Sequence, residues 1–200
     1  MDVKSVVLTG VGGQGILTIA RILGLALVNA KVNVIISEVH GMAQRGGSVI
    51  VHVKFGRDAH SPLVPEGSAD LIASLEMIEA LRYIRYAHSE TILIVNRRII
   101  PPPLPKVKVP SITELEEELK ATIRNTYIID CEKLALKAGS ILSANMVLLG
   151  SIVASGVVNA PKKVFIESIT TSFPPRYVEV NVKAFNLGYE FMKSLIQNQR

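Results

Sequence analysis

Cysteine is nearly missing from this 200-residue sequence, since Cys131 stands alone, and tryptophan is absent altogether. A single thiol excludes an intramolecular disulfide, and no signal-peptide pattern precedes the first strand-like segment, so we expect the protein in the reducing cytoplasm. Iron–sulfur clusters take several cysteine ligands, and the histidines form no H-E-x-x-H pair that would suit zinc. Metal chemistry on this chain alone is therefore not expected.

Other catalytic patterns are also missing. The sequence has no G-x-S-x-G elbow and no lysine after a phosphate-binding glycine loop, which argues against hydrolase and nucleotidase functions. Arg97 and Arg98 are adjacent, but neither an aromatic-rich strand motif nor a basic helix accompanies them, so we do not expect nucleic-acid binding. The 22 Lys and Arg against 17 Asp and Glu give a net charge of +5, which favours an anionic ligand or an acidic partner surface.

The stretch between Lys137 and Lys162 contains no charged residue and is long enough to suggest a membrane helix. Serine, asparagine and glycine residues interrupt it, however, as they would in a buried helix whose neighbours approach closely. We therefore expect a buried helix within a globular core and no membrane association.

Apolar periodicity divides the chain into alternating strands and helices. Strands are expected over 3–9, 32–37, 48–55, 71–75, 91–96 and 127–130, the last of them central; helices are expected over 16–29, 76–87, from 111 onward, and near 132–137, 145–157, 161–171 and 181–197. A helix opening at Ser111 carries a capping box with Glu114, and Glu116, Glu117 and Glu118 read as its solvated face.

The connection over 39–47 is too short for a parallel crossover, so the strands that it joins should be antiparallel or not adjacent. The sequence therefore predicts an α/β fold with three α/β/α layers, a mixed but mostly parallel sheet and a Rossmann-like first βαβ unit. We expect one domain over residues 1–200.

A glycine loop lies between the first strand and the first helix. Its members match G-x-G-x-x-G and are Gly10, Gly12, Gly13, Gln14 and Gly15. Glycines permit a tight turn and bring backbone N–H groups close to an anion, and the helix N-terminus adds partial positive charge. The loop is a candidate phosphate contact; the alternative is a turn that needs glycine only for packing.

A dinucleotide site would extend this loop with Glu38, at the end of the second strand, holding a ribose hydroxyl. The residues after Glu38 disfavour that interpretation, because a short glycine-rich loop replaces the expected crossover helix. A stand-alone oxidoreductase binding NAD or FAD stays open as an alternative function.

The second glycine-rich loop is the more unusual feature, and its candidate binding residues are His40, Gln44, Arg45, Gly46 and Gly47. Arg45 offers a forked cation suited to phosphate or carboxylate. We expect this loop to lie beside the first one, because both emerge where neighbouring strands end. A flexible turn with a solvated arginine is the alternative. Cys131 is expected to be a buried thiol in a strand-to-helix turn.

Two segments together resemble a known family. Gly10-Val11-Gly12-Gly13-Gln14-Gly15 and the run from Glu38 to Val49 (EVHGMAQRGGSV) are similar to the gamma-type domain of 2-oxoacid:ferredoxin oxidoreductases. The similarity continues through SANMVLLG at 143–150 and through the residues from Asn181 to Glu190, so it spans essentially the whole chain.

The resemblance implies oxidative decarboxylation of an aryl pyruvate such as indolepyruvate, with coenzyme A as cosubstrate and ferredoxin as electron acceptor. It also implies a larger alpha subunit that carries thiamine diphosphate, magnesium and the iron–sulfur clusters, and no catalytic residue or cofactor on this chain, which would be inactive when isolated. The two glycine loops would then contact an anion or the larger subunit. A non-enzymatic interaction module is a further alternative, and an exposed apolar patch would let the isolated chain form homo-oligomers.

Overall fold

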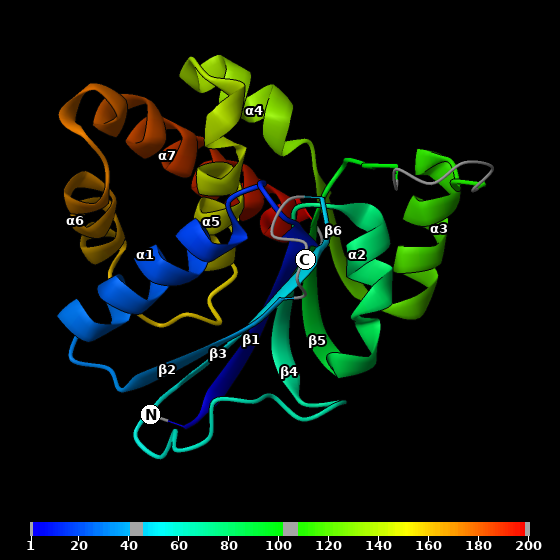
Figure 1. Ribbon diagram of the computed structural model, residues 1–200, viewed down its shortest axis with the longest axis horizontal. Helices are drawn as coiled ribbons and strands as arrows, with labels where there is room; N and C mark the ends of the chain where they lie inside the picture. Colours follow the sequence, from blue (N-terminus) through cyan, green and yellow to red (C-terminus); the bar gives the residue numbers. More distant parts are fainter. Residues whose placement is uncertain (1, 41–45, 102–107, 199–200) are drawn as a thin grey trace.

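The structure is a computed structural model that describes residues 2–40, 46–101 and 108–198, with the backbone but not the side chain of His40. One sheet lies between two layers of helices (Figure 1). Its strands are β1 (Lys4–Val11), β2 (Val34–His40), β3 (Ser48–Phe55), β4 (Ala69–Ser74), β5 (Ala87–Asn96) and β6 (Asn125–Ile129). The helices are α1 (Ile16–Asn29), α2 (Met77–Arg82), α3 (Ile112–Thr122), α4 (Cys131–Ala138), α5 (Ala144–Ala154), α6 (Lys162–Ser172) and α7 (Pro175–Asn198), with short 3₁₀ turns η1 (Ile84–Tyr86) and η2 (Ile141–Ser143).

The strand order is β2-β3-β1-β4-β5-β6. β3 is antiparallel to both β1 and β2, whereas the pairs from β1 through β4 and β5 to β6 are parallel. The predicted mixed, mostly parallel sheet is confirmed, and so is the antiparallel pairing across the short connection. The first βαβ unit is split, however, because β3 lies between β1 and β2.

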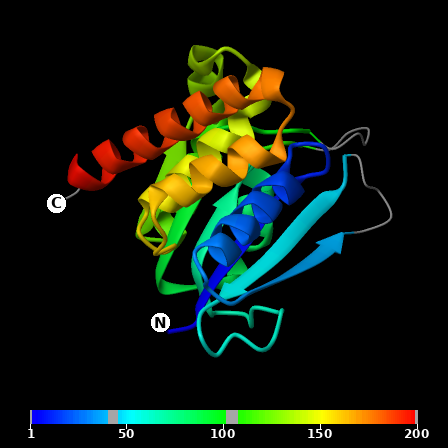
Figure 2. The same cartoon turned by 90° about the vertical axis from the view of Figure 1, so that its left-hand side faces the viewer.

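Each face of the sheet has its own apolar core. α1 and α4 to α7 cover one face, whereas α2 and α3 cover the other (Figures 1 and 2). β1 contributes to both cores, because Val6 and Leu8 point into one and Val7 points into the other. This alternation on a strand buried on both faces explains the continuous apolar run near the N-terminus.

Two sequence-based expectations about secondary structure were wrong. The helix expected over 76–87 ends at Arg82, because the chain tightens into η1 and Ala87 already pairs with Ala69 of β4. The strand near 127–130 is not central: β6 is the edge of the sheet, since every later element in the described residues is helical. Its apolar sequence reflects helices above and below rather than strands on both sides.

The uncharged stretch forms η2 and α5, which is buried from Asn145 through Val153. The expected buried helix is thus confirmed, and in the described part of the chain no helix has both the length and the apolarity needed to cross a bilayer. α5 and α7 approach closely because each presents a glycine. A Cβ on Gly150 would collide with the backbone of Phe185, and one on Gly188 with the backbone of Val147.

Replacement of Gly150 by alanine tests this contact. Backbone atoms cannot move aside as a side-chain end can, so Gly150→Ala should lower the free energy of unfolding by about 3 kcal/mol or more. Chemical denaturation measures the loss. Gly24→Ala in α1 is the matched control, because its new methyl would meet only the flexible end of Ile36, and it should be nearly neutral. Equal losses in the two variants would contradict the close packing of α5 on α7.

Candidate functional site

The first glycine loop is a tight turn between β1 and α1. Gly13 and Gly15 adopt φ angles of 99° and 91°, a region that favours glycine. Gly15 is the N-cap of α1 and offers no side chain to bond the first-turn amides of the helix. Those amides have no partner within the helix, so they are the groups of this loop that could meet an anion.

Gln14 holds the loop in place. Its Oε1 accepts a hydrogen bond from the Val11 amide at 2.7 Å, and its Nε2 donates to the Leu75 carbonyl at 2.9 Å. The side chain therefore links the ends of β1 and β4. Gly10 leaves the room for it, since a Cβ there would lie 2.9 Å from the Gln14 oxygen.

The two glycine loops lie side by side, as expected. The Gly12 amide donates to the Gly47 carbonyl at 2.8 Å, and the Gly46 amide donates to the Gly12 carbonyl at 3.2 Å. This pairing extends the β1–β3 ladder beyond its last strand residues. It also occupies the amides of Gly12 and Gly46, which leaves Gly13 and the start of α1 as the better candidates for ligand contact.

The remaining predicted site residues do not all join this edge. Gln44 and Arg45 lie outside the described residues, as does the side chain of His40. Glu38 is exposed on the edge strand β2, in a groove against α1, and β3 separates its strand from the first glycine loop. In a dinucleotide fold the corresponding strand is adjacent to the first one, so this topology disfavours the NAD or FAD alternative.

The sheet has a switch point between β1 and β4. The chain leaves β1 for α1 on one face and leaves β4 for α2 on the other, so a crevice opens at the carboxyl ends of these strands. A cavity of about 540 Å³ lies on the α2 side, and one of about 350 Å³ lies on the side of η2 and α4. Such a crevice is where ligands bind in open α/β sheets.

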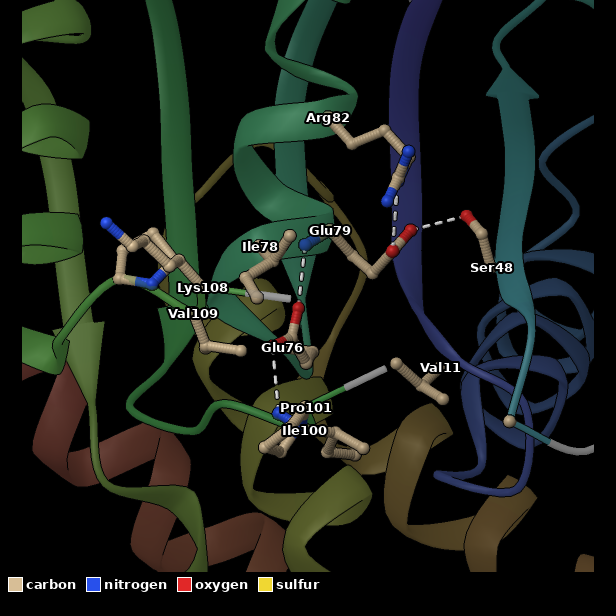
Figure 3. Close-up of a pocket in the computed structure, with 12 residues that line it drawn as sticks. Val11, Ser48, Glu76, Ile78, Glu79, Arg82, Ile100, Pro101, Lys108 and Val109 are labelled. Carbon is tan, nitrogen blue, oxygen red and sulfur yellow. Dashed lines mark hydrogen bonds and ion pairs between the residues drawn. The ribbon is translucent and has the colours of Figure 1, made fainter. Parts of the chain in front are cut away.

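Two buried carboxyl groups in the larger cavity escaped the sequence analysis (Figure 3). Glu76 is 1% exposed and accepts hydrogen bonds from the amides of Glu79 at 2.7 Å and Ile100 at 3.0 Å. Burial raises the pKa of Glu76 above its usual value, the nearby Glu79 charge adds to the rise, and the backbone hydrogen bonds oppose it. The signal was the N-cap of a short helix, which a periodicity search does not weigh.

Glu79 ties the second glycine loop to α2. It accepts a hydrogen bond from the Ser48 hydroxyl and forms an ion pair with Arg82, whose Nε lies 3.0 Å from the Glu79 carboxylate. The Ser48 hydroxyl also lies 2.8 Å from the hydroxyl of Tyr83. Because Ser48 directly follows Gly47, this network and the Gly12 pairing fix the described end of the second loop from both sides.

The smaller cavity has a rim with cationic and apolar groups. Arg98 forms an ion pair with Glu132, and Asn96 donates to the Leu75 carbonyl at 3.1 Å while accepting from the Cys131 amide at 3.0 Å. On the same rim, Leu142 is 85% exposed. An isolated leucine can be exposed on any protein, but one at the mouth of a crevice is a candidate contact for a partner.

Cys131 and the acidic groups do not suit a metal centre. Cys131 is fully buried, and burial raises the pKa of its thiol well above the usual range. Among residues 2–40, 46–101 and 108–198, no three His, Cys, Asp or Glu side chains gather as a ligand set. An iron–sulfur cluster takes several thiolate ligands, and the sequence offers one cysteine. The expected buried thiol at the start of a helix is confirmed.

Comparison with known proteins now gives the class. A family model described as pyruvate ferredoxin/flavodoxin oxidoreductase matches residues 5–191. The chain belongs to this family of oxidoreductases, and the resemblance drawn from the glycine loops is confirmed.

The individual relatives are more specific. Indolepyruvate oxidoreductase subunit IorB of Pyrococcus horikoshii is 41% identical over 200 residues, covering 98% of this chain and 99% of that protein. The same-named subunit of Thermococcus kodakarensis is 40% identical, covering 98% of this chain and 99% of its own.

Solved structures share the fold at lower identity. The gamma subunit of a keto/oxoacid ferredoxin oxidoreductase from Geobacter sulfurreducens gives a TM-score of 0.70 at 21% identity, covering 96% of this chain and 99% of that one. A 2-oxoglutarate:ferredoxin oxidoreductase from Magnetococcus marinus, solved with 2-oxoglutarate, coenzyme A and succinyl-CoA bound, gives 0.74 at 17% identity, covering 97% of this chain and 32% of that one.

The buried cap at Glu76 predicts a pH-dependent stability. A carboxyl whose pKa rises on folding stabilises most below its unfolded pKa, and that contribution is lost as pH rises through the folded value. Glu76→Gln leaves one of the two backbone amides without an oxygen acceptor, so it should cost about 1–3 kcal/mol. Because glutamine does not titrate, the deficit should grow as pH is lowered from neutrality toward 4.5, the ordinary value of the carboxyl.

Denaturation curves of both proteins across this pH range measure the difference. Glu118→Gln, on the exposed face of α3, is the control and should leave stability unchanged at every pH. A deficit that stays constant or shrinks on acidification would show that Glu76 does not titrate as proposed.

Proposed function

We propose that this chain is the small subunit of an indolepyruvate:ferredoxin oxidoreductase. The proposal is supported chiefly by the relatives named for indolepyruvate, which match at about two-fifths identity over nearly their full length. In the reaction an aryl pyruvate loses carbon dioxide, its acyl group passes to the thiol of coenzyme A, and the electrons released reduce ferredoxin.

The decarboxylating and redox cofactors belong, on this proposal, to a larger partner subunit. Thiamine diphosphate with magnesium would supply the carbanion chemistry there, and iron–sulfur clusters would carry the electrons. In support, the sequence holds one cysteine, and that thiol lies buried at the start of α4. This chain then works by completing the assembly, in the cytoplasm and without a cofactor of its own.

The paired glycine loops are the candidate contact for coenzyme A or for the larger subunit. They lie at the switch point, where the amides at the start of α1 have no partner within the helix and favour negative charge. Arg45 directly precedes Gly46 in the sequence and adds a forked cation. The phosphate groups of coenzyme A are anions that such amides and a guanidinium bind, so we expect the paired glycine loops to bind and orient that cosubstrate.

Reconstitution tests the assignment. The chain and the larger subunit should each be inactive alone, whereas together they should reduce ferredoxin with indolepyruvate and coenzyme A. Turnover of a 2-oxoacid by this chain by itself, or a stoichiometric flavin or nicotinamide bound to it, would overturn the proposal.

Arg45→Ala tests whether the paired glycine loops bind coenzyme A. Loss of a charge-assisted hydrogen bond to phosphate should raise the KM for coenzyme A about tenfold or more, with a smaller change in kcat. Arg124→Ala is the control, because Arg124 is exposed just before β6, at the opposite end of the parallel strands from the glycine loops. If Arg45→Ala leaves both the KM for coenzyme A and subunit association unchanged, the second loop has neither role.

Leu142→Asp tests the apolar rim. If this side chain is buried against the larger subunit, a carboxylate there should weaken association by about tenfold or more, as loss of an interface anchor does. Titration of one labelled subunit with the other measures the affinity. Leu63→Asp, 53% exposed in the loop after β3 at the far end of the sheet, should have no effect; equal weakening would locate the interface elsewhere.

A further inference from the structure

β2 is an open edge of the sheet. It pairs with β3 on one side, and no strand of the described chain pairs with it on the other (Figure 2). Its residues from Val34 to Ser37 are half-buried, and Glu38 and Val39 are exposed. The outward N–H and C=O groups of this strand form no hydrogen bond with any described residue. An unprotected edge of this kind is a ready template for another strand.

A groove of about 740 Å³ runs between this edge and α1, lined by Leu17, Thr18, Arg21, Ile36, Ser37 and Glu38. Arg21 and Glu38 carry opposite charges, yet neither forms an ion pair with any residue in the described ranges. Leu17 is 42% exposed, and Val28 on the same helix is 59% exposed. Arg21 does donate a hydrogen bond to the Ser172 carbonyl at 3.4 Å, so what it lacks within the described residues is a counter-ion. The edge therefore combines unpaired backbone groups, apolar side chains and two opposite charges that form no ion pair within the described chain.

We propose that β2 is the interface between two copies of this chain, paired antiparallel about a two-fold axis at Ser37. In that register Ser37 lies opposite its own copy, Ile35 lies opposite Val39, and Ile36 lies opposite Glu38. Along a strand, the backbone N–H and C=O groups of every second residue point to the same side. In each of these pairs, therefore, both residues point their backbone groups toward the other copy or both point them away from it. The ladder between the copies can therefore form whichever set of groups faces outward.

The side chains match in the same register. Ile36 faces α1, because its Cδ1 would lie 2.6 Å from a Cβ on Gly24, so Glu38 shares that face of the sheet. Opposite Ile36 of one copy, Glu38 of the other enters the groove that holds Arg21. On the reverse face, Ile35 of each copy meets the exposed Val39 of the other. Each contact occurs twice, as a closed two-fold interface requires.

This reciprocity is why the occupant is a second copy and not a different protein. Both members of the charge pair and both members of the apolar pair come from this one chain, and one register satisfies them together. An unrelated strand would need to supply a matching acid and base at the same spacing.

Cross-linking tests the register directly. Cys131 is buried, so Ser37→Cys would introduce the one readily accessible thiol of the described chain, and it would face its own copy across the axis. A short thiol-to-thiol cross-linker should then join two copies, both in the purified full chain and in the complex with the larger subunit. Leu136→Cys, 60% exposed on α4, is the control and should give little product.

Cross-linking of Ser37→Cys to the larger subunit would show that another protein covers this edge, and would overturn the proposal. So would an absence of any product above that of the control.

A charge swap supplies the second readout. Arg21→Glu and Glu38→Arg each place like charges against each other twice in the dimer, so each should raise the dimer dissociation constant about tenfold or more. The double variant restores opposite charges and should restore the dimer. Analytical ultracentrifugation over a wide concentration range measures this, with melting temperatures as a check on folding. A wild-type chain that stays monomeric, or a double variant without recovery, would refute the two-fold pairing.

Discussion

The antiparallel pairing of β3 with β1 is the constraint on which the rest of the site depends. It brings the segment after β2 back beside the first strand, so the two glycine-rich loops end at one edge and bond to each other through Gly12, Gly46 and Gly47. Without this insertion, β2 could adjoin β1 as in a dinucleotide-binding fold, and Glu38 would stand next to the first loop. One strand placement thus separates this protein from the enzymes that its first motif suggests.

Much of this could be read from the sequence where local patterns and tertiary structure agree. α1 and β3 have the bounds that their apolar periodicity predicts, and the capping box at Ser111 forms as expected. The mixed sheet followed from the length of one connection. These features depend on neighbours in the sequence or on the reach of the chain, both of which a single sequence carries.

What the sequence could not provide depends on residues that meet only after folding. The end of α2 is set by the pairing of Ala87 with Ala69, and the edge position of β6 is set by the order of the whole sheet. Glu76 and Glu79 fall within the helix expected over 76–87, and no local sequence pattern marks them as buried. Both are buried in the folded chain, and their hydrogen-bond partners Ile100 and Ser48 lie on segments well separated in the sequence. A sequence pattern reveals motifs of neighbouring residues, but it does not reveal contacts between residues that lie far apart in the chain.

The carbonyl oxygen of Leu75 receives two amide donors, Gln14 from the first glycine loop and Asn96 from the end of β5. Asn96 in turn accepts from the first residue of α4. The Leu75 oxygen, whose two lone pairs are both used, thereby links the ends of β1, β4 and β5, and Asn96 connects them to the start of α4. Any shear between these strands would have to stretch one of those bonds. The mouth of the crevice should consequently shift as a rigid unit when another protein docks.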